Sequence, residues 1–171
     1  MSVRNLDHLF KPGSIALVGA DTEPGSLGAR LAENLIGHGF QGAIMPVGAE
    51  GPIQGLPSYA SVNELPTAPD LAVIATPAET VPEIIDALGK RGTRSAVVIP
   101  PGFAEIGPEG QALQQRMLDA AKPHVLRVVG PNCLGLLATE LDLNASMIRT
   151  RPLKGTLAFA AQSGAVMSTV V

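Results

Sequence analysis

Short apolar runs alternate with stretches of helical periodicity along the first 129 residues of the chain. Each run is continuous rather than alternating, and the runs cover residues 14–18, 43–47, 71–75, 96–99 and 125–129. Continuous apolar runs of this length are typical of parallel strands that are buried on both faces. Because parallel strands are joined by right-handed crossovers, the pattern predicts an α/β fold with a Rossmann-type, doubly wound parallel sheet.

The segments between these runs carry helix signals. Ser26 stands where an N-cap is expected, and residues 61–64 and 80–83 have the spacing of capping boxes. The expected helices cover residues 6–10, 26–37, 61–64, 80–91 and 109–121. In the last of these, the side chains predicted to face the core are Leu113, Met117 and Leu118.

The regular alternation ends after residue 129. Residues 136–155 are mixed, residues 156–161 have the composition of a strand, and residues 162–164 open a helix that continues to Val171. We therefore divide the chain into a Rossmann-like domain, residues 1–150, and a segment 151–171 that begins a truncated second domain. Without its own sheet, the segment 156–171 is expected to pair with another copy or to add to an exposed strand edge.

Composition excludes several functional classes. The net charge is −3, aromatic residues make up 3%, and Lys and Arg form no cluster, which argues against a nucleic-acid partner. No apolar run approaches the ~18 residues of a membrane span. The single cysteine, Cys133, is compatible with a reducing compartment, and with three scattered His residues it predicts no metal site. We expect a cytoplasmic protein that is able to form a homo-oligomer.

The loop after the first apolar run is the main candidate for ligand binding. It runs from Gly19 through Pro24 and Gly25 to the N-cap Ser26. A turn at this place directs the N-terminus of the next helix toward the carboxyl edge of the sheet, where its free N–H groups can bind an anion. Ligands of doubly wound sheets bind at that edge. The loops that meet there are 19–28, 47–57, 75–80, 100–107 and 130–135.

A nicotinamide cofactor is one possible ligand, as in an NAD(P)-binding domain of an oxidoreductase or a redox sensor. The turn after Gly19 is, however, several residues longer than the GxGxxG fingerprint. The acidic residue expected at the end of the second strand is also late, because Glu50 follows Val47 by three positions. Packing alone could explain Gly25 and Gly28, but it explains less well why a helix N-terminus would be directed at the ligand edge.

Taken in order, the loop motifs resemble the CoA-binding domain of the NDP-forming acyl-CoA synthetases. That superfamily includes the succinyl-CoA synthetase α subunit, ADP-forming acetate–CoA ligases and bacterial protein lysine acetyltransferases that carry a GNAT domain. The motifs span nearly the whole chain, and the ordered set is specific. They are Ser14-Ile15-Ala16-Leu17-Val18-Gly19-Ala20, Pro24-Gly25-Ser26-Leu27-Gly28, Gly102-Phe103-Ala104-Glu105, Gly130-Pro131-Asn132-Cys133-Leu134-Gly135, Leu143-Asn144-Ala145-Ser146 and Gln162-Ser163-Gly164-Ala165-Val166.

The resemblance implies a site for CoA or an acyl-CoA and no catalytic residue in this chain. Gly25, Ser26 and Leu27 would lie against the nucleotide part of CoA, and Asn132 and Cys133 would face the thiol end. The other implied contacts are Gly19, Ala20, Pro24, Val47, Thr76, Pro77, Pro100, Pro101 and Gly102. In a ligase parent, a phosphohistidine domain and an ATP-grasp domain would use ATP or ADP and Mg²⁺, and these domains would be partners of this one. In an acetyltransferase parent, the module would instead sense acyl-CoA or regulate the GNAT domain.

Two departures from the family pattern concern affinity. The family usually has a lysine after the second strand, where this chain has Gly48-Ala49-Glu50, and Ser-Ala where this chain has Pro100-Pro101. Losing a charge-assisted phosphate contact costs about 1.5–3 kcal/mol. We therefore expect either weak CoA binding or binding of an acyl-CoA that depends on other contacts.

Overall fold

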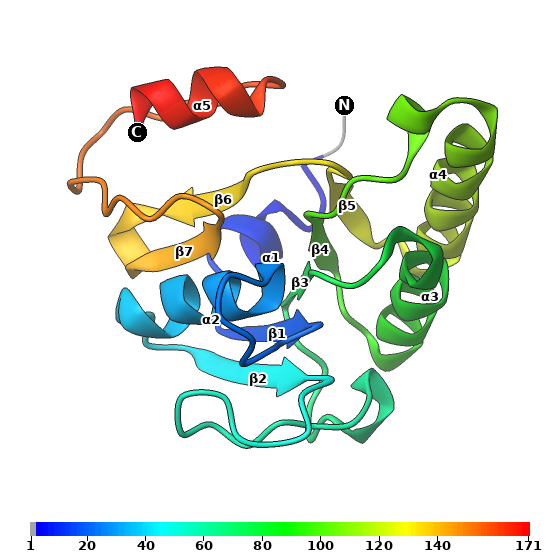
Figure 1. Ribbon diagram of the computed structural model, residues 1–171, viewed down its shortest axis with the longest axis horizontal. Helices are drawn as coiled ribbons and strands as arrows, with labels where there is room; N and C mark the ends of the chain where they lie inside the picture. Colours follow the sequence, from blue (N-terminus) through cyan, green and yellow to red (C-terminus); the bar gives the residue numbers. More distant parts are fainter. Residues whose placement is uncertain (1–2) are drawn as a thin grey trace.

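The computed structural model describes residues 3–171 and contains a five-stranded parallel sheet with the strand order β2-β1-β3-β4-β5 (Figure 1). The doubly wound Rossmann-like fold expected from the apolar runs is thus confirmed. The direction in which strands are added reverses between β1 and β3, which is the topological switch point of such a sheet. The strands are β1 (Ser14–Val18), β2 (Ala43–Val47), β3 (Leu71–Ile74), β4 (Ser95–Val98) and β5 (Arg127–Val129).

Helices cover both faces of the sheet (Figure 1). On one face lie α1 (Leu6–Phe10) and α2 (Leu27–Gly37), and on the other lie α3 (Val81–Arg91) and α4 (Pro108–Ala121). Successive strand residues point to opposite faces, so that Ile15 and Leu17 pack with α2 while Ala16 and Val18 pack with α3. Burial on both sides is the physical reason for the continuous apolar runs.

The helix ends agree with the sequence in part. Ser26 caps α2, since its Oγ accepts a hydrogen bond from Ala29 N at 3.0 Å. Thr80 does not cap α3: its backbone is already helical, and its hydroxyl donates to Pro77 O at 2.8 Å. The expected capping box of residues 80–83 is therefore wrong. The helix instead continues from a short 3-10 turn over Ala78–Thr80.

Two further details of the helices differ from expectation. Ser61 makes no side-chain cap, and only a 3-10 turn over Val62–Glu64 follows it. In α4, Met117 is fully buried, but Leu118 is 44% exposed. The assignment of Leu118 to the core is wrong because α4 covers the sheet with a narrow stripe that Leu118 falls outside.

An antiparallel hairpin after β5 was not expected from the sequence. Its strands are β6 (Gly135–Ala138) and β7 (Leu143–Ser146), and β7 lies on α2 (Figure 1). Asn34 of α2 donates from Nδ2 to Ser146 O at 2.7 Å and to Ile148 O at 3.1 Å. Asn144 accepts from the Ser146 hydroxyl at 2.6 Å and donates to Ile148 O at 2.8 Å. Buried polar groups need such partners, so the motif at residues 143–146 fixes the hairpin to α2.

The chain beyond the hairpin is exposed. The expected strand over residues 156–161 is wrong, because this segment has no strand conformation and pairs with none of the strands described here. Leu153 and Leu157 are 93% and 98% exposed, and a strand without a neighbour to share its hydrogen bonds is not stable. The helix expected after residue 162 is confirmed as α5 (Gly164–Val170). Pairing of the segment with another copy stays a prediction.

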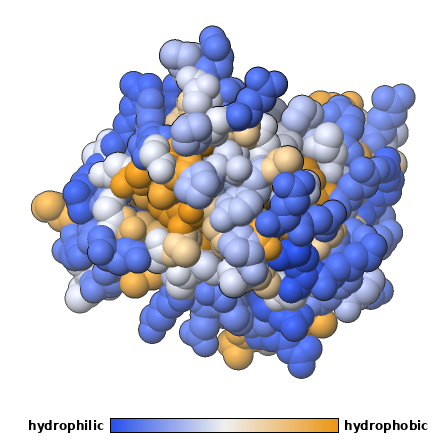
Figure 2. All heavy atoms as spheres, turned by 90° about the horizontal axis from the view of Figure 1, so that it is seen from below, coloured by the Kyte–Doolittle hydropathy of each residue, from blue (hydrophilic) through white to orange (hydrophobic). Residues whose placement is uncertain are grey.

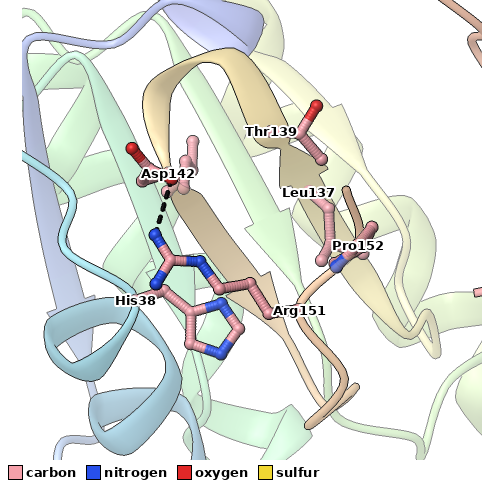
Figure 3. A pocket seen from close by; sticks show the side chains of 7 residues that line it. His38, Leu137, Thr139, Asp142, Arg151 and Pro152 are labelled. Atoms are coloured by element: carbon pink, nitrogen blue, oxygen red, sulfur yellow. Dashed lines mark hydrogen bonds and ion pairs between the residues drawn. The ribbon is translucent and has the colours of Figure 1, made fainter. Parts of the chain in front are cut away.

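Ion pairs hold the start of this segment to the hairpin. Asp142 Oδ1 lies 2.8 Å from Arg151 Nη2, and Asp142 Oδ2 lies 3.1 Å from Lys154 Nζ. Figure 3 shows the Arg151 side chain extended toward Asp142 beside the ring of His38. The hydrogen bond from Arg151 holds the pKa of Asp142 below its ordinary value, with Lys154 adding to the effect. Farther along, an open hollow of about 960 Å³ separates the segment from β6 and α1.

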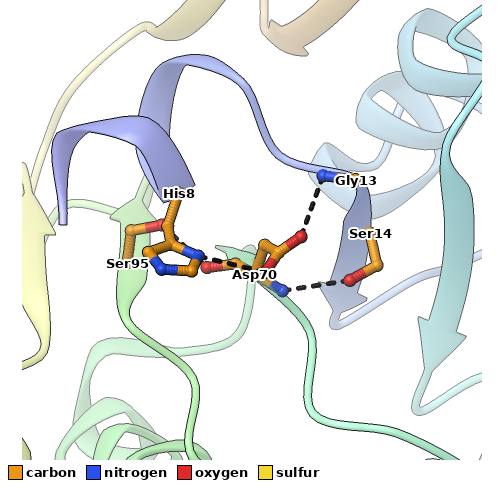
Figure 4. Close-up of polar contacts among 5 residues, drawn as sticks. All are labelled: His8, Gly13, Ser14, Asp70 and Ser95. Atoms are coloured by element: carbon orange, nitrogen blue, oxygen red, sulfur yellow. Dashed lines mark hydrogen bonds and ion pairs between the residues drawn. The ribbon is translucent and has the colours of Figure 1, made fainter.

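A polar cluster around Asp70 lies at the edge of the sheet where the parallel strands begin (Figure 4). Its carboxylate accepts from Gly13 N at 2.9 Å and contacts His8 Nδ1 at 3.0 Å, and its backbone N donates to Ser14 Oγ at 3.1 Å. Ser95 Oγ donates to the carbonyl of Asp70 at 2.9 Å. These contacts tie α1 and the starts of three strands together, so the cluster is structural.

The surface is mostly polar, as Figure 2 shows for the face seen from below in Figure 1. Among the helices that the structure describes, none combines the length and the apolar character that crossing a membrane requires.

Candidate functional site

The loops that follow the five parallel strands meet at one edge of the sheet. The first contact joins the loops after β1 and β2, because Gly19 N and Ala20 N both donate to Val47 O, at 2.9 and 3.0 Å. The second joins the loops after β1 and β3: a Cβ on Gly19 would lie 3.0 Å from Thr76 Cγ2. Gly19 has φ +85°, so the turn there needs glycine for its backbone as well as for space.

The remaining loops continue this series of contacts. Gly102, after β4, has φ +109°, and a Cβ on it would lie 2.9 Å from Ala78 Cβ in the loop after β3. Asn132 N, after β5, donates to Pro100 O at 3.1 Å. All five loops are thus in contact with a neighbour, in the order of the strands. The loops that hold the predicted site residues therefore form one continuous edge, as the order of strands and helices in the sequence predicted.

The N-terminus of α2 lies at the switch point within this edge. The Ser26 hydroxyl uses the amide of Ala29, whereas the amides of Leu27 and Gly28 make no hydrogen bond within the part of the chain that the structure describes. Pro24 and Gly25 are exposed, and a Cβ on Gly25 would meet no atom within 4 Å. Two free N–H groups and the positive end of an 11-residue helix dipole make this helix end a candidate anion site.

Close packing holds this helix end in place. A Cβ on Gly28 would clash with the carbonyl oxygen of Gly19 and would lie 3.0 Å from Asp21. The loop after β1 therefore lies directly against the first turn of α2, and Gly28 is the residue that permits this approach. Gly28 has a packing role, while Gly25 faces open space.

Two charged residues that the sequence did not single out stand beside this helix end. Arg30 is one turn along α2 from Ser26, and its Nε is buried without a hydrogen-bond partner. Residues four apart share a helix face, so Arg30 is on the same face of α2 as the N-cap Ser26. Asp21 accepts from Glu23 N at 3.0 Å, which holds the pKa of its carboxyl below the ordinary value. The sequence could have indicated Arg30, because it follows the expected N-cap Ser26 by four positions.

The loop after β2 has no cation at its start. Gly48 N donates to Tyr59 O at 2.9 Å, and Ala49 N donates to Ser58 Oγ at 3.2 Å. The first two backbone amides of this loop are thus used by the chain itself. Gly48 is exposed with φ +101°. The acyl-CoA synthetase pattern would place a lysine here, and no other cation on this loop takes its place.

The loop after β4 contains a carboxylate with two backbone donors. Glu105 Oε1 accepts from Gly102 N at 2.5 Å and from Phe103 N at 3.2 Å. The N–H of Gly102 holds the pKa of the Glu105 carboxyl below its ordinary value. Glu105 belongs to a motif that the sequence indicated, but its hydrogen-bond role depends on the fold of a loop.

Cys133 is a half-buried thiol rather than a reactive one. Its Sγ donates to Val98 O at 3.3 Å, and burial raises the pKa of the thiol. A raised pKa lowers the thiolate fraction that nucleophilic chemistry needs. Beside it, Asn132 is exposed with φ +51°. The arrangement can bind a ligand, but it offers no activated nucleophile.

The predicted site residues are exposed, half-buried or fully buried, and the half-buried ones are Gly19, Ser26, Leu27, Thr76, Gly102 and Cys133. Side chains or backbone of Pro24, Gly25, Pro77, Pro101 and Asn132 are exposed at the edge. Ala20, Val47 and Pro100 are buried, so they can act only through backbone atoms. Among the residues described, no group of three or more His, Cys, Asp or Glu side chains is placed to hold a metal ion.

Comparison with known proteins places these features in a family. A family model described as a CoA binding domain matches residues 13–139. The acetate–CoA ligase [ADP-forming] I subunit alpha of Pyrococcus furiosus is 39% identical over 95% of this chain, and the acetate–CoA ligase [ADP-forming] of Methanocaldococcus jannaschii is 35% identical over 97%. The chain spans 36% and 23% of the length of these two relatives.

Solved structures agree with this placement. A dinucleotide-forming acetyl-coenzyme A synthetase 1 of Ca. Korarchaeum cryptofilum, in complex with phosphate and ADP, superimposes with a TM-score of 0.91 at 37% identity. That match covers 96% of this chain and 35% of the synthetase chain. The nicotinamide alternative receives no support from these relatives. The chain is homologous to the alpha subunits of ADP-forming acetate–CoA ligases, and it belongs to the family of CoA-binding domains.

Proposed function

We propose that this chain is the module that binds CoA and presents its thiol within a larger ADP-forming acyl-CoA synthetase. The observation that carries the proposal is the free N-terminus of α2, placed at the switch point of a sheet whose five C-terminal loops are in contact. Family membership supplies the ligand, and the geometry suggests how this chain binds it.

The nucleotide part of CoA would lie at α2. The unpartnered amides of Leu27 and Gly28 would donate to a phosphate, and the open space at Gly25 would let the ligand approach the backbone. Arg30 would supply the positive charge that the loop after β2 lacks, since its buried Nε has no other partner among the described residues. A charge-assisted contact of this kind contributes about 1.5–3 kcal/mol when it is well formed.

The pantetheine part would cross the loops after β3 and β4. Thr76 and Pro77 offer a rigid wall on one side, and Pro101 and Gly102 on the other, with donor-free prolines at both. Asn132 and Cys133 would then lie near the thiol end. Because its pKa is raised, Cys133 would carry little thiolate and would not compete with the CoA thiol for the acyl group.

The parent enzyme would carry the remaining chemistry. Its phosphohistidine and ATP-grasp domains would use ATP or ADP with Mg²⁺ to form an acyl phosphate, and the CoA held here would attack it. Both relatives compared above are ligases, which favours this parent over an acetyltransferase with a GNAT domain. We propose that residues 151–171 begin the next domain. Self-association and a cytoplasmic location stay predictions.

Calorimetric titration and thermal shift with CoA and NAD(H) would test the proposal. We expect CoA to bind and to stabilise the protein, and NAD(H) to do neither. Arg30→Gln should weaken CoA binding about tenfold, a loss of ~1.4 kcal/mol, whereas Arg116→Gln on the exposed side of α4 should leave it unchanged. Stabilisation by NAD(H) without stabilisation by CoA would overturn the proposal.

A further inference from the structure

The loop after β4 is held by an acidic side chain of its own. Two consecutive amides, those of Gly102 and Phe103, donate to the same oxygen of Glu105, at 2.5 and 3.2 Å. Consecutive backbone N–H groups that point to one place form an anion-binding concavity. In this loop, the anion is part of the chain.

We propose that Glu105 is a positioning residue of the CoA site, which fixes the loop after β4 for the pantetheine arm and excludes phosphate from it. This assignment rests on the proposed function and adds a residue to it. Glu105 is exposed and contributes nothing to the hydrophobic core, so its role is confined to the loop that it holds.

Packing contacts also hold the loop after β4, one on the side of α4 and one on the side of the loop after β3. The ring of Phe103 is fully buried between the sheet and α4, and a Cβ on Gly110 would clash with the Phe103 carbonyl. Gly102 approaches Ala78 in the neighbouring loop. Glu105 adds the polar link on the solvent side, where the backbone has φ +109° at Gly102 and no side chain to anchor it.

The same link extends to the loop after β5. Asn132 N donates to Pro100 O at 3.1 Å, two residues before the amide that Glu105 holds. A shift of Gly102 is therefore transmitted through Pro101 and Pro100, whose φ angles are restricted, to Asn132. Because Asn132 and Cys133 are the residues proposed to lie at the thiol end, Glu105 sets the spacing between two walls of the pantetheine path.

The charge of Glu105 also determines which part of the ligand this loop accepts. Its carboxylate occupies the two amides that could otherwise bind a phosphate, and its negative charge repels one. An uncharged pantetheine arm meets neither obstacle. The phosphates are then directed to α2, where two amides are free and Arg30 is near.

The test compares Glu105→Ala and Glu105→Gln with the control Glu109→Ala, an exposed acidic residue in the first turn of α4. Calorimetry with CoA and with 3′-phosphoadenosine 5′-diphosphate, which lacks the pantetheine arm, separates the two parts of the site. Glu105→Ala should weaken CoA binding about tenfold and change binding of the nucleotide probe less than twofold. Glu105→Gln should restore CoA affinity to within about threefold of wild type, because an amide oxygen can accept the same two hydrogen bonds.

Hydrogen exchange gives a readout that needs no ligand. The amides of Gly102 and Phe103 should exchange about tenfold faster in Glu105→Ala than in wild type, while the amide of Ala104, which donates to Gln114 Oε1 at 3.4 Å, should change less. If wild type binds CoA and Glu105→Ala binds it equally well, the assignment of Glu105 is wrong. If both ligands lose affinity together, the role of Glu105 is general stability and the assignment is also wrong. Wild-type protein that binds neither ligand would overturn the proposed function itself.

Discussion

Replacing Gly28 by alanine should destabilise the protein and disturb the candidate phosphate site at the same time. The new Cβ would clash with the carbonyl oxygen of Gly19 and would lie 3.0 Å from Asp21. Both neighbours belong to the loop after β1, which the hydrogen bonds of Gly19 and Ala20 to Val47 hold against the sheet. The loop cannot move away freely, so the first turn of α2 must move.

The magnitude follows from two opposing terms. Alanine is favoured over glycine inside a helix by about 0.5–1 kcal/mol. Against this, the methyl group and the carbonyl oxygen must move apart to at least 3.4 Å, where ordinary contact begins. Overpacking of a rigid site costs about 1–3 kcal/mol, and occasionally more. We expect Gly28→Ala to lower the free energy of unfolding by about 1–3 kcal/mol, toward the upper end because the obstacle is backbone.

Gly37→Ala is the matched control, since Gly37 lies in the same helix and a Cβ on it would meet no atom within 4 Å. It should keep the propensity gain and stabilise the protein by up to about 1 kcal/mol. Urea denaturation followed by circular dichroism gives both free energies, and titration with CoA shows whether the displaced amides of Leu27 and Gly28 lose affinity. Equal stabilities of the two variants would refute the close-approach argument.

Three further outcomes are expected. In urea denaturation, Asn34→Ala should lower the free energy of unfolding by about 2–3 kcal/mol, because it removes two buried hydrogen bonds to the hairpin. The control Asn63→Ala, at an exposed position, should change this free energy by less than about 0.5 kcal/mol. Asp21→Asn should strengthen CoA binding about two- to fivefold at low salt and not at 1 M salt, because it removes a negative charge beside the α2 N-terminus; equal affinities at low salt would place the phosphates elsewhere. Cys133, whose pKa is raised by burial, should react with iodoacetamide at pH 8 more slowly than a free thiol, should accelerate as the pH rises further, and should reach the free rate in urea.

Local pattern was sufficient for the sheet and the helix that define the candidate site. The apolar runs of β1 to β5 predicted a parallel sheet because burial on both faces leaves no alternation. Ser26 predicted the start of α2 because an N-cap needs only a side-chain oxygen that accepts from an amide two or three residues later, which is a local feature of the sequence. Consequently the edge that carries the candidate site could be named from the sequence.

Other features depended on contacts that no local pattern contains. The strands β6 and β7 have four residues each, and they are stable because Asn34, more than 100 positions away, closes the hydrogen bonds of Ser146 and Ile148. The segment 156–161 has the composition of a strand but lacks a neighbour to pair with, so composition alone gave the wrong answer. Thr80 failed as a cap because the preceding turn had already set its backbone angles.

For the candidate site, the sequence by itself determined which loops share one edge, because strand direction fixes where each loop emerges. It did not determine which donors in those loops remain available to a ligand. That depends on tertiary contacts. Glu105 accepts from two amides after β4, Tyr59 and Ser58 accept from the first two amides after β2, and the amides of Leu27 and Gly28 in α2 stay free. A hydrogen bond is a property of two positions in space, and only the folded chain decides which pairs meet.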